Sequence, residues 1–201
     1  TTRRVGNRVV RDPFPGNIIP ADRFDPVARR VLELYPLPNL PGIANNHFFS
    51  GAASADTNQY DGRIDHNFTP NSRLFFRYSR RDFAEVEPGG LPLPADGGNW
   101  TTTDLTSNSY VANWSAVISP TVSNELRFGL TDTDSVLDIP WDENLNTTLG
   151  IQGVPDLGDD NARGSTRFVP TGYSELGARS FWPNRNNLNL FQLTDHVMKV
   201  Q

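Results

Sequence analysis

The chain has 201 residues, of which 36% are hydrophobic, a net charge of -5 and no cysteine. Its arginines are scattered along the chain, so nucleic acid is not expected as a partner, and the lack of cysteine excludes a disulfide scaffold, a thiolate metal site and a cysteine nucleophile. The mean hydropathy of -0.49 and the absence of any long apolar run exclude a helical membrane protein, so a membrane segment would have to be a β-barrel.

Residues 1–58 form the first predicted section, a loop section with one short helix. The helix is expected near 26–35, because Asp25 can cap it, Pro26 suits its first position, and Pro36 ends it. Apolar residues recur at helical spacing within it, namely Val27, Val31 and Leu34. Residues 1–10 alternate weakly, 11–20 and 35–46 are rich in turn residues, and 50–58 read as a polar connector.

Residues 59–80 predict a β-hairpin, because they contain two arms that alternate with a period of two around a polar turn at 69–72. The first arm has one face of Tyr60, Gly62, Ile64, His66 and Phe68, and the second arm has Leu74, Phe76 and Tyr78. Charged and polar residues take the opposite face, and each arm is about ten residues long, the length that a tilted strand needs to cross a bilayer.

Residues 110–130 predict a second hairpin of the same form. Its apolar face contains Tyr110, Ala112, Trp114, Leu126, Phe128 and Leu130, and a short turn with Ser119 and Pro120 joins its arms. Residues 82–106 and 131–187 are rich in glycine and proline and are expected to be long loops. Residues 188–201 predict a fifth strand with two ambiguous faces, one with Leu190 and His196 and the other with Phe191 and Leu193.

Short turns alternate with long loops along residues 59–201, which is the order found around outer-membrane barrels. The predicted fold is therefore all-β: a segment of an antiparallel transmembrane β-barrel with long extracellular loops, part of one larger barrel domain. The chain begins without methionine and stops within a predicted strand, so we expect a piece of a longer polypeptide.

This fold assigns a role to each face of the strands. The predicted lumen-facing residues are Arg63, Asp65, Arg77, Asn113 and Arg127. The predicted lipid-facing residues are Tyr60, Ile64, Phe68, Leu74, Phe76, Tyr78, Tyr110, Ala112, Trp114, Leu126, Phe128 and Leu130. The charged residues can line a lumen and contact a plug or substrate, and the pattern favours the simpler interpretation that they form cross-strand pairs on a wet face.

Catalytic patterns are lacking in the sequence. The three histidines, His47, His66 and His196, have no spacing typical of a catalytic or metal site, and no G-x-S-x-G elbow is present, so an enzyme is not expected.

A group of residues in the last long loop, Asp156, Asp159, Asp160 and Asn161, offers oxygen ligands for calcium without the EF-hand spacing, and a solvated acidic loop is favoured over a calcium site. The same judgement covers Asp132, Asp134 and Asp138. No cofactor is expected.

Three tryptophans lie in the predicted loops, namely Trp100, Trp141 and Trp182. Exposed aromatic side chains there would contact a ligand such as a sugar or a peptide. The alternative is that they pin the loops down.

Four segments together resemble a known family. They are FPGNIIPADRFDPVARRVLELYPLPN, QYDGRIDHNFTPNSRLFFRYS, SPTVSNELRFG and NLFQLTDHV, and their order resembles the Oar-like branch of TonB-dependent outer-membrane receptors. The resemblance implies a piece of the receptor barrel in the bacterial outer membrane, which takes up or binds an unidentified substrate. The implied partners are membrane lipid, the rest of the barrel and its plug, and the TonB complex, although the sequence contains no TonB box and no recognisable plug.

Two alternatives to this receptor are left open by the sequence. The first is a soluble, secreted β-sandwich whose long loops contact a ligand, because its strands would show the same alternation. The second, ranked last, is a β-rich glycosidase, which has carboxylates but no pair that can be placed at catalytic separation.

Overall fold

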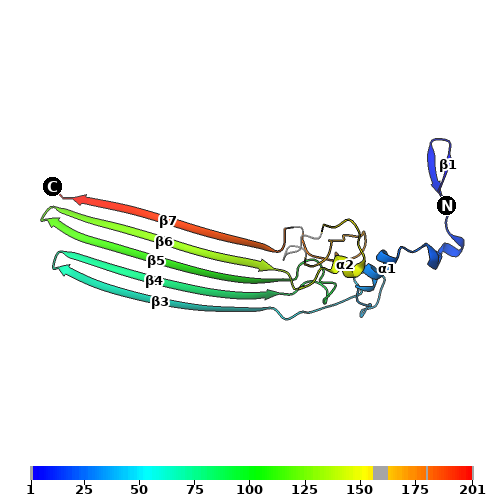
Figure 1. The fold of residues 1–201 in the computed structure, drawn as a ribbon, viewed down its shortest axis with the longest axis horizontal. Coiled ribbons are helices and arrows are strands. Elements are labelled where there is room, and N and C mark those ends of the chain that lie inside the picture. The colour runs from blue at the N-terminus through cyan, green and yellow to red at the C-terminus, as the bar shows by residue number, and fades with distance from the viewer. Residues whose placement is uncertain (1, 156–162, 180, 201) are drawn as a thin grey trace.

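A computed structural model of the protein describes residues 2–155, 163–179 and 181–200. Its main feature is a single five-stranded antiparallel sheet with the strands in chain order (Figure 1). The strands are β3 (Ser54–Thr69), β4 (Ser72–Glu87), β5 (Thr101–Ser119), β6 (Val122–Asp138) and β7 (Asn184–Lys199). The β3–β4 and β5–β6 turns lie at one end of this long sheet, and the longer connections lie at the other.

The two turns are built in the same way, as their sequences predict. Thr69 accepts a hydrogen bond from the backbone N–H of Asn71 at 3.2 Å, and Ser119 accepts one from the backbone N–H of Thr121 at 3.4 Å. Each turn has a proline between these two residues and a register shift just before it, between Asn67 and Thr69 and between Val117 and Ser119. The hydroxyl fixes the turn and the proline fixes its first φ angle, which gives two short connections at the same end.

The strands are longer than the alternation predicts. The loop expected at 82–106 was wrong in extent, because β4 continues to Glu87 and β5 begins at Thr101. The loop expected at 131–187 is likewise shortened, since β6 continues to Asp138 and β7 begins at Asn184. The added residues are mostly polar, and the few apolar ones are divided between the two faces, with Phe83 and Leu105 on one and Val86 and Val136 on the other. The ladder of backbone hydrogen bonds therefore continues without the apolar alternation that marks a strand in sequence.

The N-terminal section contains the predicted helix. The helix α1 (Pro26–Glu33) begins after Asp25, whose carboxylate accepts hydrogen bonds from the backbone N–H groups of Val27 and Ala28 at 2.8 and 2.9 Å. Before it lie the hairpin of β1 (Thr2–Val5) and β2 (Arg8–Arg11) and two 3-10 turns, η1 (Pro15–Asn17) and η2 (Ala21–Arg23). The connector expected at 50–58 becomes part of β3 from Ser54 onward.

A cap of packed loops stands at the end of the sheet opposite the turns (Figure 1). We define the cap as residues 26–35, the β4–β5 loop 88–100 and the described part of the β6–β7 loop 139–183, which includes α2 (Leu145–Leu149). All the buried hydrophobic residues of the described chain lie in it: Val31, Leu91, Ala95, Ile139, Trp141, Leu145, Leu149 and Leu176. The hydrophobic core is therefore in the loops and not against the sheet.

The sheet itself is open and uncovered. Every described residue of β7 except Asn184 is exposed, all of β3 is exposed, and β3 and β7 each pair with one neighbour only. The other sheet in the described chain is the two-stranded β1–β2 hairpin, which lies beyond the cap in Figure 1. A soluble β-sandwich would need a second sheet against the apolar face, so this alternative from the sequence has no support in the fold.

Candidate functional site

The register of the five strands sorts the predicted site residues into two sets on opposite faces. One row across the sheet joins Ile64, Phe76, Ala112, Phe128 and Leu193, and the adjacent row on the opposite face joins Asp65, Phe75, Asn113, Arg127 and Thr194. All twelve residues predicted to face lipid share the first face, which we call the apolar face. All five predicted to face a lumen share the second, the charged face. Phe75 is a large apolar residue on the charged face.

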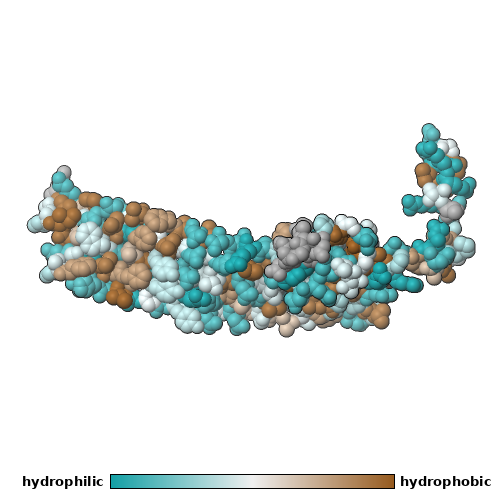
Figure 2. All heavy atoms as spheres, viewed as in Figure 1, coloured by the Kyte–Doolittle hydropathy of each residue, from teal (hydrophilic) through white to brown (hydrophobic). Residues whose placement is uncertain are grey.

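The apolar face is uncovered over the half of the sheet near the turns. Ile64 is 72% exposed and Phe191 is 63% exposed, which is unusual for large apolar residues in a folded sheet. Figure 2 shows hydrophobic side chains gathered over this half and hydrophilic ones further along, before the cap. From Tyr60 to Phe68 the band measures about 27 Å along the strand, which a tilt of roughly 40° reduces to about 20 Å.

Aromatic residues with polar groups border the apolar band. Tyr78 and Tyr110 lie side by side with ring centroids 5.1 Å apart, and the Tyr78 hydroxyl donates to Asn108 at 2.8 Å. Near the turns, the Trp114 indole N–H donates to the Ser72 hydroxyl at 3.0 Å. The row beyond Tyr78 on this face is the border of the band: it joins Tyr60 to the polar residues Arg80, Asn108, Asp132 and Asn189. Aromatic residues at a border between apolar and polar rows match the girdles of outer-membrane barrels.

The fifth strand, β7, adds residues to both faces of the sheet. The sequence alone does not show which of its residues belong to which face. Phe191, Leu193 and Val197 join the apolar face, and Phe191 contacts Phe128 with ring centroids 5.1 Å apart. Asp195 also lies on this face, where it accepts a hydrogen bond from the Asn124 amide at 2.6 Å. The sequence offered no sign of this polar pair within the apolar band, because the faces of β7 follow only from its register with β6.

The charged face carries ion pairs that run along and across strands. Asp65 accepts from Arg63 at 2.8 Å and from Arg73 at 2.5 Å, and Asp61 accepts from Arg77 at 2.9 Å. On the neighbouring hairpin, Glu125 accepts from Arg127 at 2.7 Å and from the Asn113 amide at 2.6 Å. These contacts agree with the simpler interpretation of the charges as pairs on a wet face, and they include residues that the sequence did not select, namely Arg73 and Asp61.

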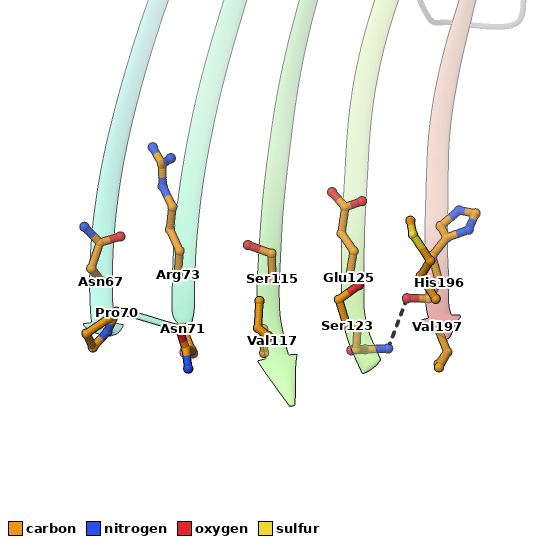
Figure 3. A pocket seen from close by; sticks show the side chains of 14 residues that line it. Asn67, Pro70, Asn71, Arg73, Ser115, Val117, Ser123, Glu125, His196 and Val197 are labelled. Carbon is orange, nitrogen blue, oxygen red and sulfur yellow. Dashed lines mark hydrogen bonds between the residues drawn. The ribbon is translucent and has the colours of Figure 1, made fainter. Parts of the chain in front are cut away.

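A hollow of about 620 Å³ lies at the turn end of the sheet, as Figure 3 shows. Asn67, Arg73, Ser115, Glu125 and His196 line it from five neighbouring strands and share one row of the charged face. Apolar side chains, among them Val117, Val197 and Met198, complete its lining, so the hollow lies at the turn end of the charged face with a mixed polar and apolar lining.

The cap is held by contacts between segments that are distant in sequence. Arg30 of α1 donates to the backbone oxygen of Leu149 at 2.8 Å, and the Tyr35 hydroxyl donates to the backbone oxygen of Ser174 at 2.6 Å. Partial burial, with the neighbouring Tyr173, raises the pKa of Tyr35. The helix α1 therefore clamps the β6–β7 loop.

The three loop tryptophans hold the cap together. Trp141 is 6% exposed and belongs to the core, and Trp182 packs against that core. Trp100 contacts Phe49 with ring centroids 6.0 Å apart. The structure thus favours pinning of the loops over an exposed ligand contact for these side chains.

Asp96 is the most perturbed acid of the cap. It is 1% exposed and accepts a hydrogen bond from the backbone N–H of Gly98. Burial raises the pKa of Asp96 to about 7, the Gly98 hydrogen bond opposes this shift, and the nearby Glu175 carboxylate adds to it. Asp96 is therefore a group whose charge changes near neutral pH.

The described residues form no group of three or more acidic or histidine side chains that could hold a metal ion. His47 contacts the backbone oxygen of Leu37 in the N-terminal section, whereas His66 and His196 lie on opposite faces of the two edge strands. Asp134 pairs with Arg185 at 2.5 Å and Asp138 with Arg163 at 2.6 Å. The predicted calcium ligands Asp156, Asp159, Asp160 and Asn161 lie outside the described residues.

None of the helices in the described part of the chain is long and apolar enough to cross a membrane. Comparison with curated proteins and with solved structures gives no match. Comparison with family models matches residues 1–201 to an outer membrane beta barrel domain. This match covers the whole chain and agrees with the sequential antiparallel sheet, so the protein belongs to the outer membrane beta barrel family and is located in the bacterial outer membrane.

Proposed function

We propose that the chain forms part of the barrel of a TonB-dependent outer-membrane receptor, which takes up or binds a substrate at the cell surface. The observation that carries this proposal is the division of the sheet: an uncovered apolar band on one face, ion pairs on the other, short turns at one end and a packed cap at the other. Within a bilayer the apolar band faces lipid and the charged face lines a lumen.

The orientation follows from the lengths of the connections. Outer-membrane barrels keep short turns in the periplasm and long loops outside the cell. The turns at 69–72 and 119–122 are thus periplasmic, and the cap is extracellular. Since β3 to β7 have 16 to 19 residues and crossing needs about 10, the outer third or more of each strand stands above the membrane.

The cap supports a receptor in preference to a simple pore. Its core is formed from three separate segments, so it is a preformed surface at the outer mouth and not a set of independent loops. The TonB dependence rests on the four segments that resemble the Oar-like branch, of which the first forms α1 and its flanks and the others form strands and turns of the sheet. The open edges of β3 and β7 pair with the remaining strands of the barrel.

We propose no catalytic role and no cofactor. In the part of the charged face near the turns, Asp61, Asp65 and Glu125 each accept hydrogen bonds from arginine, so none of these three is free to act as a general acid or base as the glycosidase alternative would require.

Cysteine labelling in intact cells tests the orientation, and the chain's lack of cysteine gives a clean background over these residues. Asn71→Cys would place a thiol in the first turn, and Thr171→Cys would place one on an exposed position of the cap. A bulky maleimide that cannot cross the outer membrane should label Thr171→Cys in intact cells and Asn71→Cys only after lysis. Labelling in the reverse order contradicts the proposed orientation.

Binding to TonB tests the receptor class. The full-length protein, purified in detergent, should be retained by an immobilised periplasmic domain of TonB from the same bacterium. A receptor known to use that TonB is the positive control, and a porin is the negative control. Retention no better than that of the porin would contradict TonB dependence while leaving the barrel assignment intact.

A further inference from the structure

Arg81 differs from the other arginines of the sheet. It lies on the charged face of β4, in the row that joins Gln59, Ser107 and Thr133, between the ion pairs below and the cap above. Within the described residues it has no carboxylate partner, and its guanidinium carbon lies 5.5 Å from the centroid of the Phe83 ring. Every other arginine of β3 to β7 has a carboxylate partner: Arg63, Arg73, Arg77, Arg80, Arg127 and Arg185.

The nearby carboxylates are already occupied or out of reach. Asp61, one row closer to the turns, accepts hydrogen bonds from Gln59, Arg77 and Ser79. Asp82 lies on the opposite face and pairs with Arg80. Glu85 shares the charged face, but it is four residues further along β4, about 13 Å from Arg81 along the strand. The positive charge of Arg81 is thus not neutralised by the neighbouring side chains.

Small hydroxyl groups surround Arg81. A hollow of about 360 Å³ is lined by Arg81 together with Gln59, Ser79, Ser107, Ser109 and Thr133, and Arg80 and Leu105 complete its lining. Two of the hydroxyls, on Ser107 and Thr133, are hydrogen-bonded to each other at 2.9 Å across β5 and β6, which leaves one of the two with a proton to donate elsewhere. A guanidinium with hydroxyl and amide donors is the set of groups that binds carboxylate or phosphate.

We propose that this hollow binds the carboxylate or phosphate group of a small anionic solute. The Arg81 guanidinium supplies the charge and the paired donors, and the free hydroxyl proton of the Ser107–Thr133 pair and the Gln59 amide supply further hydrogen bonds. Because the site lies on the charged face between the cap and the ion pairs, a solute that passed the cap would meet it before the ion-paired part of the lumen. This inference rests on the proposed function, which directs the charged face to the lumen, and it makes the substrate class anionic.

Calorimetry on the full-length protein in nonionic detergent tests the site. Inorganic phosphate and citrate are titrated in separate experiments at an ionic strength held constant with sodium chloride. Wild-type protein should bind at least one of them saturably, and Arg81→Gln should weaken that binding about tenfold or more, as expected for loss of a charge-assisted contact. Arg73→Gln is the matched control. It removes one positive charge from the charged face and leaves Asp65 paired with Arg63, so anion binding should be unchanged.

The double variant Ser107→Ala/Thr133→Val keeps the charge and removes the hydroxyls, so it tests the site even if Arg81→Gln fails to fold. It should weaken binding by a few fold. The proposal is overturned if wild type binds neither anion, as it would if a carboxylate elsewhere in the full-length protein neutralised Arg81. It is also overturned if the site variants bind as wild type does. Retention on TonB is measured on the same preparations, so failure of the anion site is distinguished from failure of the receptor assignment.

Discussion

At the scale of single residues, two adjacent glycines of the cap should respond differently to the same substitution. A Cβ at Gly89 would overlap the backbone oxygen of Asp96, whereas a Cβ at Gly90 meets nothing within 4 Å. Gly89→Ala should therefore destabilise the cap by about 1–3 kcal/mol, and Gly90→Ala should change it little. Hydrogen exchange of the 91–98 amides in the full-length protein measures this difference, and equal protection in the two variants would show that the loop is not packed as described.

Asp96 should make the stability of the cap depend on pH. Its pKa of about 7 exceeds the ordinary value of 3.8. At a pH between these two values, Asp96 therefore keeps its proton in the folded cap and loses it in the unfolded loop. The contribution to stability is full below the ordinary value and is lost as the pH rises through about 7, by a few kcal/mol at most, since one pKa unit is worth about 1.4 kcal/mol.

Hydrogen exchange at about pH 5 and about pH 8, corrected for intrinsic rates, should show weaker protection of the cap at the higher pH. Asp96→Asn keeps an acceptor for the Gly98 N–H and removes the ionisable group, so it should abolish the difference. The exposed Asp104→Asn is the control. An unchanged pH dependence in Asp96→Asn would assign the effect to another group.

Neighbouring residues of β5 should differ sharply in their tolerance of arginine. Ala112 lies in the middle row of the apolar face, and Asn113 lies on the charged face beside Glu125. Ala112→Arg should destabilise the membrane-inserted barrel by roughly 2 to 4 kcal/mol, while Asn113→Arg should be tolerated. The fraction of folded protein in isolated outer membranes, read from heat-dependent gel mobility, measures both. Equal yields would contradict the assignment of the two faces.

At the scale of elements, the sequence predicts the helices and strands whose structure is decided by residues close to them in the chain. The helix α1 follows from Asp25 and Pro26, and the two hairpins follow from alternation and from turns that contain proline. The outer parts of β4, β5 and β6 were mistaken for loops, because water on both sides removes the selection for alternation. Their pairing joins β4 to β5 across the loop 88–100 and β6 to β7 across the longer loop 139–183, so no short turn marks it in the sequence.

The faces of β7 and the core of the cap could not be predicted for a related reason. Apolar residues occupy both faces of β7, so only the pairing of Phe128 with Leu193 shows which of them lie on the apolar face. The cap joins Val31, Leu91 and Trp141, which lie in three distant segments without any periodic pattern. Arg81 cannot be singled out from the sequence, because an unpaired charge is recognisable only when the partners of all its neighbours are known.

The clamp formed by α1 should hold the β6–β7 loop in place. Arg30→Ala removes the hydrogen bond to Leu149, and Tyr35→Phe removes the one to Ser174. The double variant should loosen the loop by about 1–3 kcal/mol, because each bond contributes about 0.5–1.5 kcal/mol. Protease added to intact cells should then cut within 139–183 faster than in wild type. Arg29→Ala, an exposed position on the same helix, is the control, and equal cutting of all three proteins would argue against a clamp.

At the scale of the whole molecule, the structure divides into three levels along one axis. The apolar band lies near the turns, the mostly polar outer parts of the strands follow it, and the cap lies at the far end; in the proposed barrel the apolar band spans the membrane and the other two levels stand above it. The proposed barrel accounts for a folded chain with so few buried residues, because in it lipid, and not a second layer of protein, covers the apolar face. The unpaired edges of β3 and β7 require further strands before the sheet can close.

The claim that the apolar face of the sheet meets lipid is tested most directly by spin-label accessibility along β6. Nitroxides are placed singly from Asn124 to Asp134 in the full-length protein in liposomes, and power saturation is measured with oxygen and with a water-soluble nickel complex. Oxygen accessibility should peak at Leu126, Phe128 and Leu130 and alternate with low values between them, and from Asp132 onward nickel accessibility should rise. Oxygen maxima at Arg127 and Gly129, or no alternation at all, would contradict it.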